Sequence, residues 1–241
     1  MIVHEDPAFL VVDKPAKLPT VPLKDDPSGK ETLLGLVGSK YPEVLSVAGK
    51  NPWEGGVVHR LDTATSGLVV LARTSEAYAS LMAIQKAELF IKEYKAVSSR
   101  CQVPALPGFP QYPYEDPFAC KGKEVSIGSL FRRYGEHQQQ VRPVCPDSPK
   151  HLLEKTSGTW YLTKVSYSGQ TAQGAQEFTC RISSGFRHQV RVHLAWSGWP
   201  LDGDAVYQGA EQEALALRAV AVLFPHPLYS EPQEFRIDTI K

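Results

Sequence analysis

The chain has 241 residues, of which 42% are hydrophobic and 22% are charged, as is usual for a soluble globular protein. Lys and Arg together number 26, and so do Asp and Glu, which makes the formal net charge at pH 7 zero. This balance argues against a protein held on nucleic acid by bulk charge. A local basic groove stays open, because the field at the site is the one that matters.

The cysteines and the ends of the chain exclude several further classes. Four scattered cysteines, none in a Cys-x-x-Cys pair, argue against a structural zinc site or a disulfide framework: Cys101, Cys120, Cys145 and Cys180. The N-terminus lacks the basic start and apolar run of a signal peptide. The apolar segment 214–224 is short and contains Arg218, so it cannot span a bilayer. We expect a cytoplasmic protein with no membrane segment.

The first third of the chain predicts strands around a polar turn. Residues 9–14 read as a short strand that Pro15 ends, and 32–37 as a helical turn. Two β-rich runs follow at 57–60 and 68–73, separated by the turn-rich segment 61–67. Polar residues held between two strands are presented rigidly at a surface.

The remaining elements predict an α+β fold with a mostly antiparallel sheet flanked by helices and loops. They are, in chain order, a helix at 75–89, a strand at 94–97, an irregular proline-rich stretch at 101–118, strands at 160–165 and 177–182, a helix at 189–197 and a strand at 215–224. Strands outnumber helices and do not alternate with them regularly, unlike in a Rossmann-type fold. We expect one domain over 1–241.

Asp62 is the first candidate for chemistry. It lies in the turn-rich segment, after His59 and Arg60 and before Thr65 and Ser66. A carboxylate there can act as a nucleophile or stabilise a developing cation. The alternative is that Asp62 only caps a turn by accepting backbone N–H groups.

The second candidate cluster lies in the predicted helix at 189–197. His188 and Arg191 are three residues apart, so a helix would place both on one face, with Gln189 and His193 on the neighbouring face. The alternative is a solvated polar face with Leu194 in the core. His188 and His193 lack the i, i+4 spacing of a zinc-binding helix, so we expect no metal.

These residues carry a resemblance to a known family. Residues 56–68, read as Gly-Val-Val-His-Arg-Leu-Asp-Thr-Ala-Thr-Ser-Gly-Leu, resemble the His-Arg-Leu-Asp-x-x-Thr-Ser-Gly-Leu signature of the RluA-type pseudouridine synthases. Six further segments match in the family's order: Val12–Pro15, Lys92-x-Tyr94-x-Ala96, His188–Leu194, Gly198–Tyr207, Leu215–Leu223 and Phe224–Pro227. Together the matches extend from residue 9 to residue 227. The segment 100–160 matches least, so we expect a divergent insert there. Against the family's pattern we also expect no separate N-terminal RNA-binding module.

The resemblance implies an enzyme that isomerises uridine to pseudouridine within ribosomal or transfer RNA. The family's catalytic carboxylate corresponds to Asp62. Arg191 corresponds to the arginine that pairs with it, and Tyr94 to the active-site tyrosine. No cofactor is expected, because substrate and product have the same atoms and oxidation level. The expected partner is RNA, bound by a monomer that flips the target base into its cleft.

The expected substrate-binding residues follow from the same matches. In the family the arginine two residues before the aspartate fills the space of the flipped base, which points to Arg60. The rest of the set is His59, Arg187, His188, Gln189 and Leu194. Where relatives have Arg-Thr, this chain has Phe186 and Arg187, which puts a backbone contact of the family in question.

Two other readings stay open. Basic residues of the divergent insert could add to RNA recognition: Lys121, Lys123, Arg132, Arg133 and Arg142. The main alternative function is a non-catalytic RNA-binding or chaperone protein on the same fold. A second is an enzyme acting on a free nucleoside or nucleotide, which would need no basic track for RNA.

Overall fold

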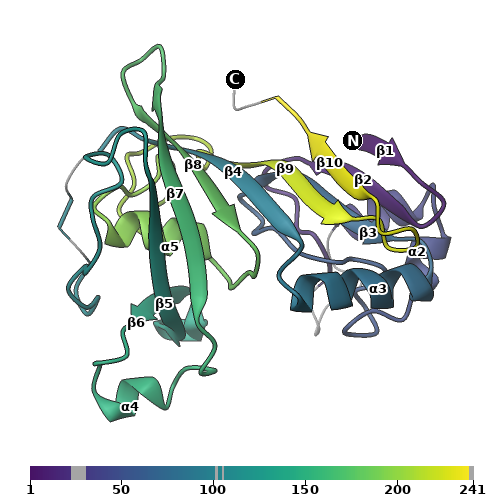
Figure 1. Ribbon diagram of the computed structural model, residues 1–241, viewed down its shortest axis with the longest axis horizontal. Coiled ribbons are helices and arrows are strands. Elements are labelled where there is room, and N and C mark those ends of the chain that lie inside the picture. The colour runs from purple at the N-terminus through teal and green to yellow at the C-terminus, as the bar shows by residue number, and fades with distance from the viewer. Residues whose placement is uncertain (23–30, 101–102, 105, 239–241) are drawn as a thin grey trace. The chain divides into compact units, whose positions relative to one another are not determined.

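The computed structural model describes residues 1–22, 31–100, 103–104 and 106–238. The chain divides into two compact units. The first unit comprises Met1–Lys92 and the C-terminal segment from Arg218, and the second comprises Glu93–Leu217. Strand β4 (Ile91–Ser98) begins in the first unit and continues in the second (Figure 1).

The first unit is built on a small sheet with the strand order β1-β2-β3-β9 and with β10 paired to β9. The strands are β1 (Ile2–Glu5), β2 (Phe9–Lys14), β3 (Ser66–Ala72), β9 (Leu217–Pro225) and β10 (Pro232–Arg236). Strands β3 and β9 run parallel, and the other pairs in this unit run antiparallel. The fully buried run of β3, from Gly67 to Ala72, explains its continuous apolar sequence.

Three helices accompany this sheet: α1 (Leu33–Gly38), α2 (Glu43–Ser46) and α3 (Ser75–Lys86). Thr74 caps α3, since its hydroxyl accepts the backbone N–H of Ala77 at 3.1 Å. Helix α3 packs against β3, and its Ala77 and Leu81 belong to the buried core cluster; Figure 1 shows the course of the helix.

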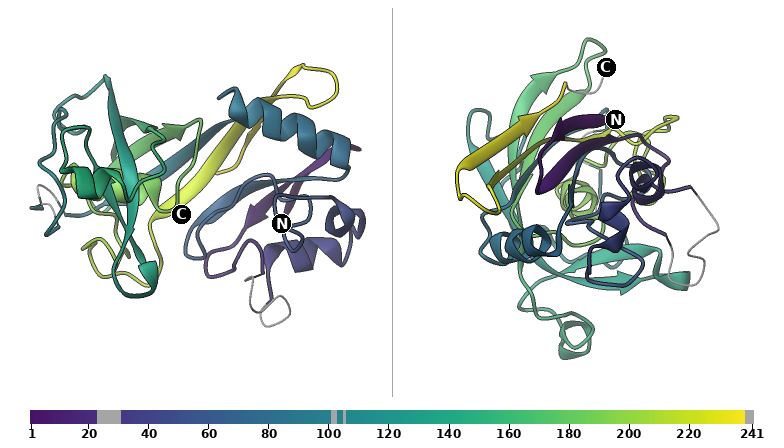
Figure 2. Two further views of the ribbon diagram at one scale, coloured as in Figure 1. Left: turned by 90° about the horizontal axis from the view of Figure 1, so that it is seen from below. Right: turned by 90° about the vertical axis from the view of Figure 1, so that its right-hand side faces the viewer.

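The second unit carries the strand order β4-β8-β7-β5-β6. These strands are β5 (Glu124–Tyr134), β6 (Gln140–Val144), β7 (Tyr161–Gln170) and β8 (Gln176–Ile182). The helices are a 3₁₀ turn at Glu136–Gln138, α4 (Lys150–Leu153) and α5 (Gln189–Trp196). Helix α5 packs against β6 and β7 (Figure 2), and all eight of its residues are buried.

The structure confirms the predicted α+β class with a mostly antiparallel sheet, and it corrects three details. Residues 57–60 form no strand but one isolated bridge, Val57 to Leu71, because the chain then turns into the loop that carries Asp62. His188 lies outside α5, since its φ of 59° is left-handed, so it does not share a helix face with Arg191. Helix α5 has no solvated polar face.

The divergent insert is part of the second unit's framework. Among its described residues, 106–118 hold no helix or strand, as expected. Strands β5 and β6, which the sequence pattern did not predict, instead extend the sheet beside β7. The chain divides into two compact units, and whether these form one domain over 1–241, as the sequence predicts, stays a prediction.

Candidate active site

The loop that carries Asp62 is clamped on its N-terminal side by a buried threonine. The hydroxyl of Thr20 donates to the carbonyl oxygen of Leu61 at 2.9 Å and accepts the Leu61 N–H at 3.2 Å. On the other side the N–H of Thr65 bonds the carbonyl oxygen of Asp62 at 3.0 Å and closes a turn. These bonds fix the backbone on both sides of the half-buried Asp62 side chain.

A buried lysine supports the same loop from β2. Lys14 is fully buried, and its Nζ donates to the carbonyl oxygens of Leu18 at 2.7 Å, Pro15 at 2.9 Å and Thr63 at 3.3 Å. Burial lowers the pKa of Lys14 to about 8, and the negative charge of Asp62 acts in the opposite direction. The positive charge of Lys14 thus interacts with the candidate catalytic carboxylate of Asp62.

Gly67 shows why the loop ends as it does. Its φ of 116° lies in the region that favours glycine, and a Cβ there would come within 2.2 Å of the carbonyl oxygen of Ala219. Strand β9 therefore approaches β3 too closely for any side chain at this position. The parallel pairing of β3 with β9 therefore requires glycine as the last residue of the Thr-Ser-Gly part of the motif.

His59 and Lys92 are two buried ionisable side chains of the first unit. His59 accepts the N–H of Val70 on Nε2 at 3.3 Å, and burial, followed by the nearby charge of Lys92, holds its pKa well below the usual range. Burial lowers the pKa of Lys92 to about 8. The Nδ1 atom of His59 has no hydrogen-bond partner among the described residues.

Arg60 behaves differently from its neighbour His59. Its side chain is 60% exposed, and its Nη1 lies 2.8 Å from Oε1 of the buried Glu54. The ion pair holds the guanidinium on one side, while most of the side chain stays accessible. This is the exposure expected of a residue that contacts RNA.

In the second unit, Arg191 forms a two-bonded fork with Asp204. Its Nε lies 2.7 Å from Oδ2 and its Nη2 lies 2.9 Å from Oδ1. The two side chains are only 7% and 0% exposed. Asp204 also accepts the backbone N–H groups of Val206 at 3.1 Å and Tyr207 at 3.3 Å, so its carboxylate holds Arg191 in one orientation.

The rest of α5 is anchored by a polar network inside the unit. The amide of Gln189 donates to the carbonyl oxygen of Leu162 at 3.0 Å and to the hydroxyl of Thr163 at 3.1 Å. His193 bonds Thr163 through Nδ1 at 2.8 Å and Ser129 through Nε2 at 3.0 Å. Burial lowers the pKa of His193 from 6.5 to about 3, so it is neutral near pH 7.

Because His193 is buried and neutral, we expect the folded chain to lose stability in acid. Below pH 6.5 the unfolded chain takes up a proton at this residue, whereas the folded chain does so only near pH 3. Stability therefore falls as the pH drops from 6.5 toward 5, by about 1.4 kcal/mol per pH unit for this residue. Urea unfolding at pH 7.5, 6.0 and 5.0 measures it. The variant His193→Gln is expected to show a shallower decline, and an identical decline would contradict the assignment.

The three residues just before α5 make contacts within the protein. His188 bonds the hydroxyl of Tyr207 through Nδ1 at 2.9 Å. Phe186, which stands where relatives have arginine, stacks on Phe131 with ring centroids 5.1 Å apart, so the substitution adds to an apolar cluster. Exposed Arg187 donates to the carbonyl oxygens of Gln138 and Gln139.

The predicted site residues thus fall into three local groups. His59, Arg60 and Asp62 share one clamped loop of the first unit. Gln189, Arg191 and the fully buried Leu194 share α5, and Tyr94, 6% exposed, lies on β4. The pairing of Arg191 with Asp62 stays a prediction.

Sequence reasoning assigned no role to Lys14 or Asp204. Both stand in segments that resemble the family, in Val12–Pro15 and Gly198–Tyr207. The available signal was a charged residue inside an otherwise apolar segment, which is costly to bury without a partner.

The described part of the chain has neither a membrane-spanning helix nor a metal-binding cluster. None of its helices is long and apolar enough to cross a membrane. No group of three or more His, Cys, Asp or Glu side chains there could hold a metal ion. Cys120, Cys145 and Cys180 are free thiols, and Cys101 lies outside the described residues.

Comparison with known proteins decides the family. The model of the RNA pseudouridylate synthase family matches residues 8–196, which is more than half of the chain. The chain belongs to this family. The resemblance to RluA-type synthases is thereby confirmed, and Asp62, Tyr94 and Arg191 all lie within the matched residues.

Curated members of the family match almost the whole chain. The ribosomal large subunit pseudouridine synthase D of Vibrio parahaemolyticus is 29% identical over 97% of this chain and 65% of its own length. The protein of that name from Haemophilus influenzae is 28% identical over 97% of this chain and 65% of its own length. The chain therefore spans just under two thirds of these relatives.

Solved structures share the pseudouridylate synthase fold. Human RNA pseudouridylate synthase domain containing 1 superposes with a TM-score of 0.65 at 19% identity, covering 98% of this chain and 82% of that chain. Human RNA pseudouridylate synthase domain containing 4 gives a TM-score of 0.63 at 17% identity, covering 100% and 88%. At this identity the likeness concerns the fold.

Proposed function

We propose that this member of the family is an RNA pseudouridine synthase with Asp62 as its catalytic carboxylate. The observation that carries the proposal is the family match over residues 8–196 with an aspartate at 62 in a loop clamped on both sides. Such a loop holds a carboxylate in one place, which a nucleophile or a cation-stabilising group requires.

The proposed reaction detaches uracil from C1′, rotates it and rejoins it through C5. Asp62 acts either by covalent attack or by stabilising positive charge at the sugar. Tyr94 stacks on the uracil and serves in proton transfer. No cofactor takes part, because the reaction moves a bond without changing oxidation level.

Arg191 pairs with Asp62 and orients its carboxylate in this proposal. The fork between Arg191 and Asp204 fixes the plane of the guanidinium, and a planar guanidinium suits the two oxygens of a carboxylate. Asp204 is then a positioning residue that holds Arg191 for Asp62.

Substrate binding requires that the target uridine leave its stack. The exposed Arg60 takes the vacated space, and Glu54 pairs with its Nη1 when no RNA is bound. Ribosomal RNA is the first substrate to test, because the relatives are named for the large ribosomal subunit. We propose that the protein acts on it as a monomer in the cytoplasm.

The test is tritium release from RNA transcribed with uridine labelled at C5. New bond formation at C5 expels that hydrogen, so turnover is counted directly. Large-subunit ribosomal RNA, transfer RNA and free uridine are offered separately. Release from ribosomal RNA, with pseudouridine found in the digested product, supports the proposal. Release from free uridine alone would favour a nucleoside enzyme, and salt-sensitive RNA binding without release from any substrate would favour a chaperone.

A further inference from the structure

The hairpin of β5 and β6 places two arginines side by side. Arg132 and Arg142 are direct partners in the antiparallel register. The guanidinium carbon of Arg142 lies 3.3 Å from the ring centroid of Tyr134, and that of Arg132 lies 4.9 Å from it. Like charges directly opposite each other destabilise a sheet, so this arrangement needs a compensating partner.

The ring of Tyr134 gives both cations a cation–π contact, but neither guanidinium has an anionic partner among the described residues. Neither forms a hydrogen bond or an ion pair there, and the Nε of Arg142 is buried without an acceptor. Arg132 is 8% exposed, and burial together with the charge of Arg142 lowers its pKa. A buried donor without an acceptor calls for an explanation, and a bound oxygen-rich anion would supply one.

The surroundings hold the two guanidinium groups in place and leave an entrance. A Cβ on Gly108 would come within 2.1 Å of the Nη1 of Arg142, so this guanidinium is held between the backbone at Gly108 and the ring of Tyr134. Tyr134 itself is 40% exposed. An oxygen-rich anion can therefore reach the cluster along the edge of the ring.

Two more cations reach the turn of the same hairpin. Arg133, on β5, donates to Oε1 of Gln138, and Arg187, just before α5, donates to the backbone carbonyls of Gln138 and Gln139. Positive charge from two segments therefore gathers at this turn, as on a surface that binds a polyanion.

We propose that Arg132, Arg142 and Tyr134 form a binding site for a backbone phosphate of the RNA, away from the target uridine. Planar guanidinium groups match the oxygens of a phosphodiester, and the exposed tyrosine edge suits the adjoining sugar. Phosphate contacts position a nucleic acid and do not read its sequence. The inference rests on the proposed RNA substrate and assigns a contact outside the chemistry of Asp62.

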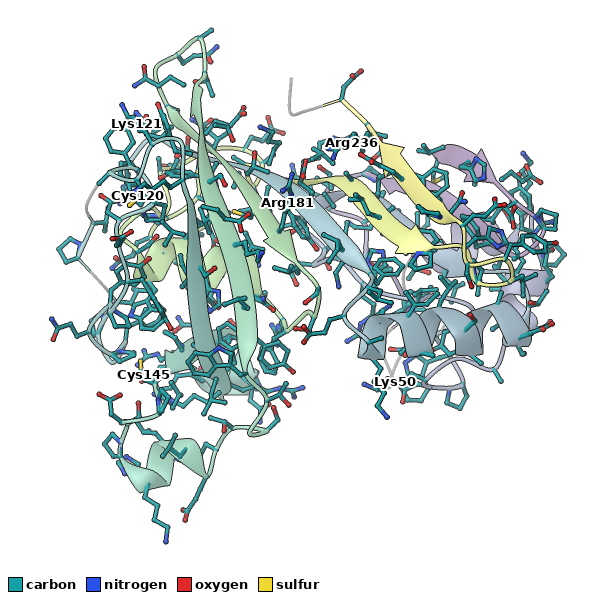
Figure 3. The ribbon with its side chains drawn as sticks, in the orientation of Figure 1. Lys50, Cys120, Lys121, Cys145, Arg181 and Arg236 are labelled. Atoms are coloured by element: carbon teal, nitrogen blue, oxygen red, sulfur yellow. The ribbon has the colours of Figure 1, made fainter. Side chains whose placement is uncertain are left out.

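The test measures RNA binding separately from catalysis. A fluorescein-labelled 20-nucleotide polyuridine RNA is titrated by fluorescence anisotropy at several salt concentrations, with the full chain and with Arg132→Met and Arg142→Met. Each variant is expected to bind about 10-fold more weakly, and the slope of log K against log salt is expected to fall by about one. The control is Arg236→Met, which removes one exposed charge from β10 (Figure 3).

Stability and turnover distinguish a ligand site from a structural role. Because the pair is mutually repulsive, Arg142→Met is expected to keep or raise the Tm without RNA, and to raise KM for RNA while kcat stays unchanged. A lower Tm with unchanged RNA affinity would overturn the proposal, as would an equal loss of affinity in Arg236→Met. If the wild type binds polyuridine but releases no tritium from any RNA, the proposed catalysis fails while the anisotropy result still decides this site.

Discussion

Replacing Asp62 with asparagine is expected to reduce tritium release from RNA by roughly 10⁴-fold or more, since loss of a catalytic aspartate alone has cost about that much in an enzyme that keeps its binding site. Asparagine has the shape of aspartate but carries no charge, so it neither attacks C1′ nor stabilises a cation there. The fold is expected to survive, since the bonds that clamp the loop are made by the backbone of Leu61 and Asp62. Single-turnover kinetics with saturating RNA and a thermal melt measure the two effects.

A matched control exists in the same unit. Asp13 forms an ion pair with Arg218 at 2.7 Å, and its side chain is 32% exposed. Asp13→Asn removes one carboxylate without touching the proposed chemistry, so turnover within a few fold of wild type is expected. Turnover retained by Asp62→Asn, or lost equally by both variants, would refute the role of Asp62.

Replacing Asp204 with alanine is expected to lower the free energy of unfolding by about 3–5 kcal/mol, the cost of leaving one member of a buried pair unpartnered. Arg191 would stay buried at 7% exposure without its two-bonded fork to Asp204. The backbone N–H groups of Val206 and Tyr207 would also lose an acceptor. For a chain of this size the Tm is expected to fall by roughly 10 °C, which calorimetry and urea unfolding measure.

Two further variants separate the ion pair from its surroundings. The double variant Arg191→Met with Asp204→Leu removes both charges, so it is expected to recover most of the lost stability. Glu177→Gln breaks the more exposed pair with Lys95 and is expected to cost no more than about 1 kcal/mol. If the double variant is as unstable as Asp204→Ala, the lost bonds to the backbone of Val206 and Tyr207 would be the cause instead.

Local patterns in the sequence were enough to predict much of the fold. The continuous apolar runs of β2 and β3 and the capped helix α3 match their predicted positions to within a few residues. These elements are specified by periodicity, capping residues and chain breakers, all of which act over a few neighbouring residues. The strands β5 and β6 lie in the segment that resembles the family least, and their apolar residues alternate less regularly.

The sequence by itself also determined the candidate chemistry, because a contiguous motif around Asp62 and a contiguous motif on α5 each lie within a few residues. Only the tertiary structure decided what holds these residues. Lys14 reaches the carbonyl of Thr63 across 49 positions, Asp204 grips Arg191 across 13, and the β5–β6 register sets Arg132 opposite Arg142. A buried charge is costly unless it has a partner. Which residue is that partner depends on packing between segments that are distant in the sequence, so a local pattern cannot predict it.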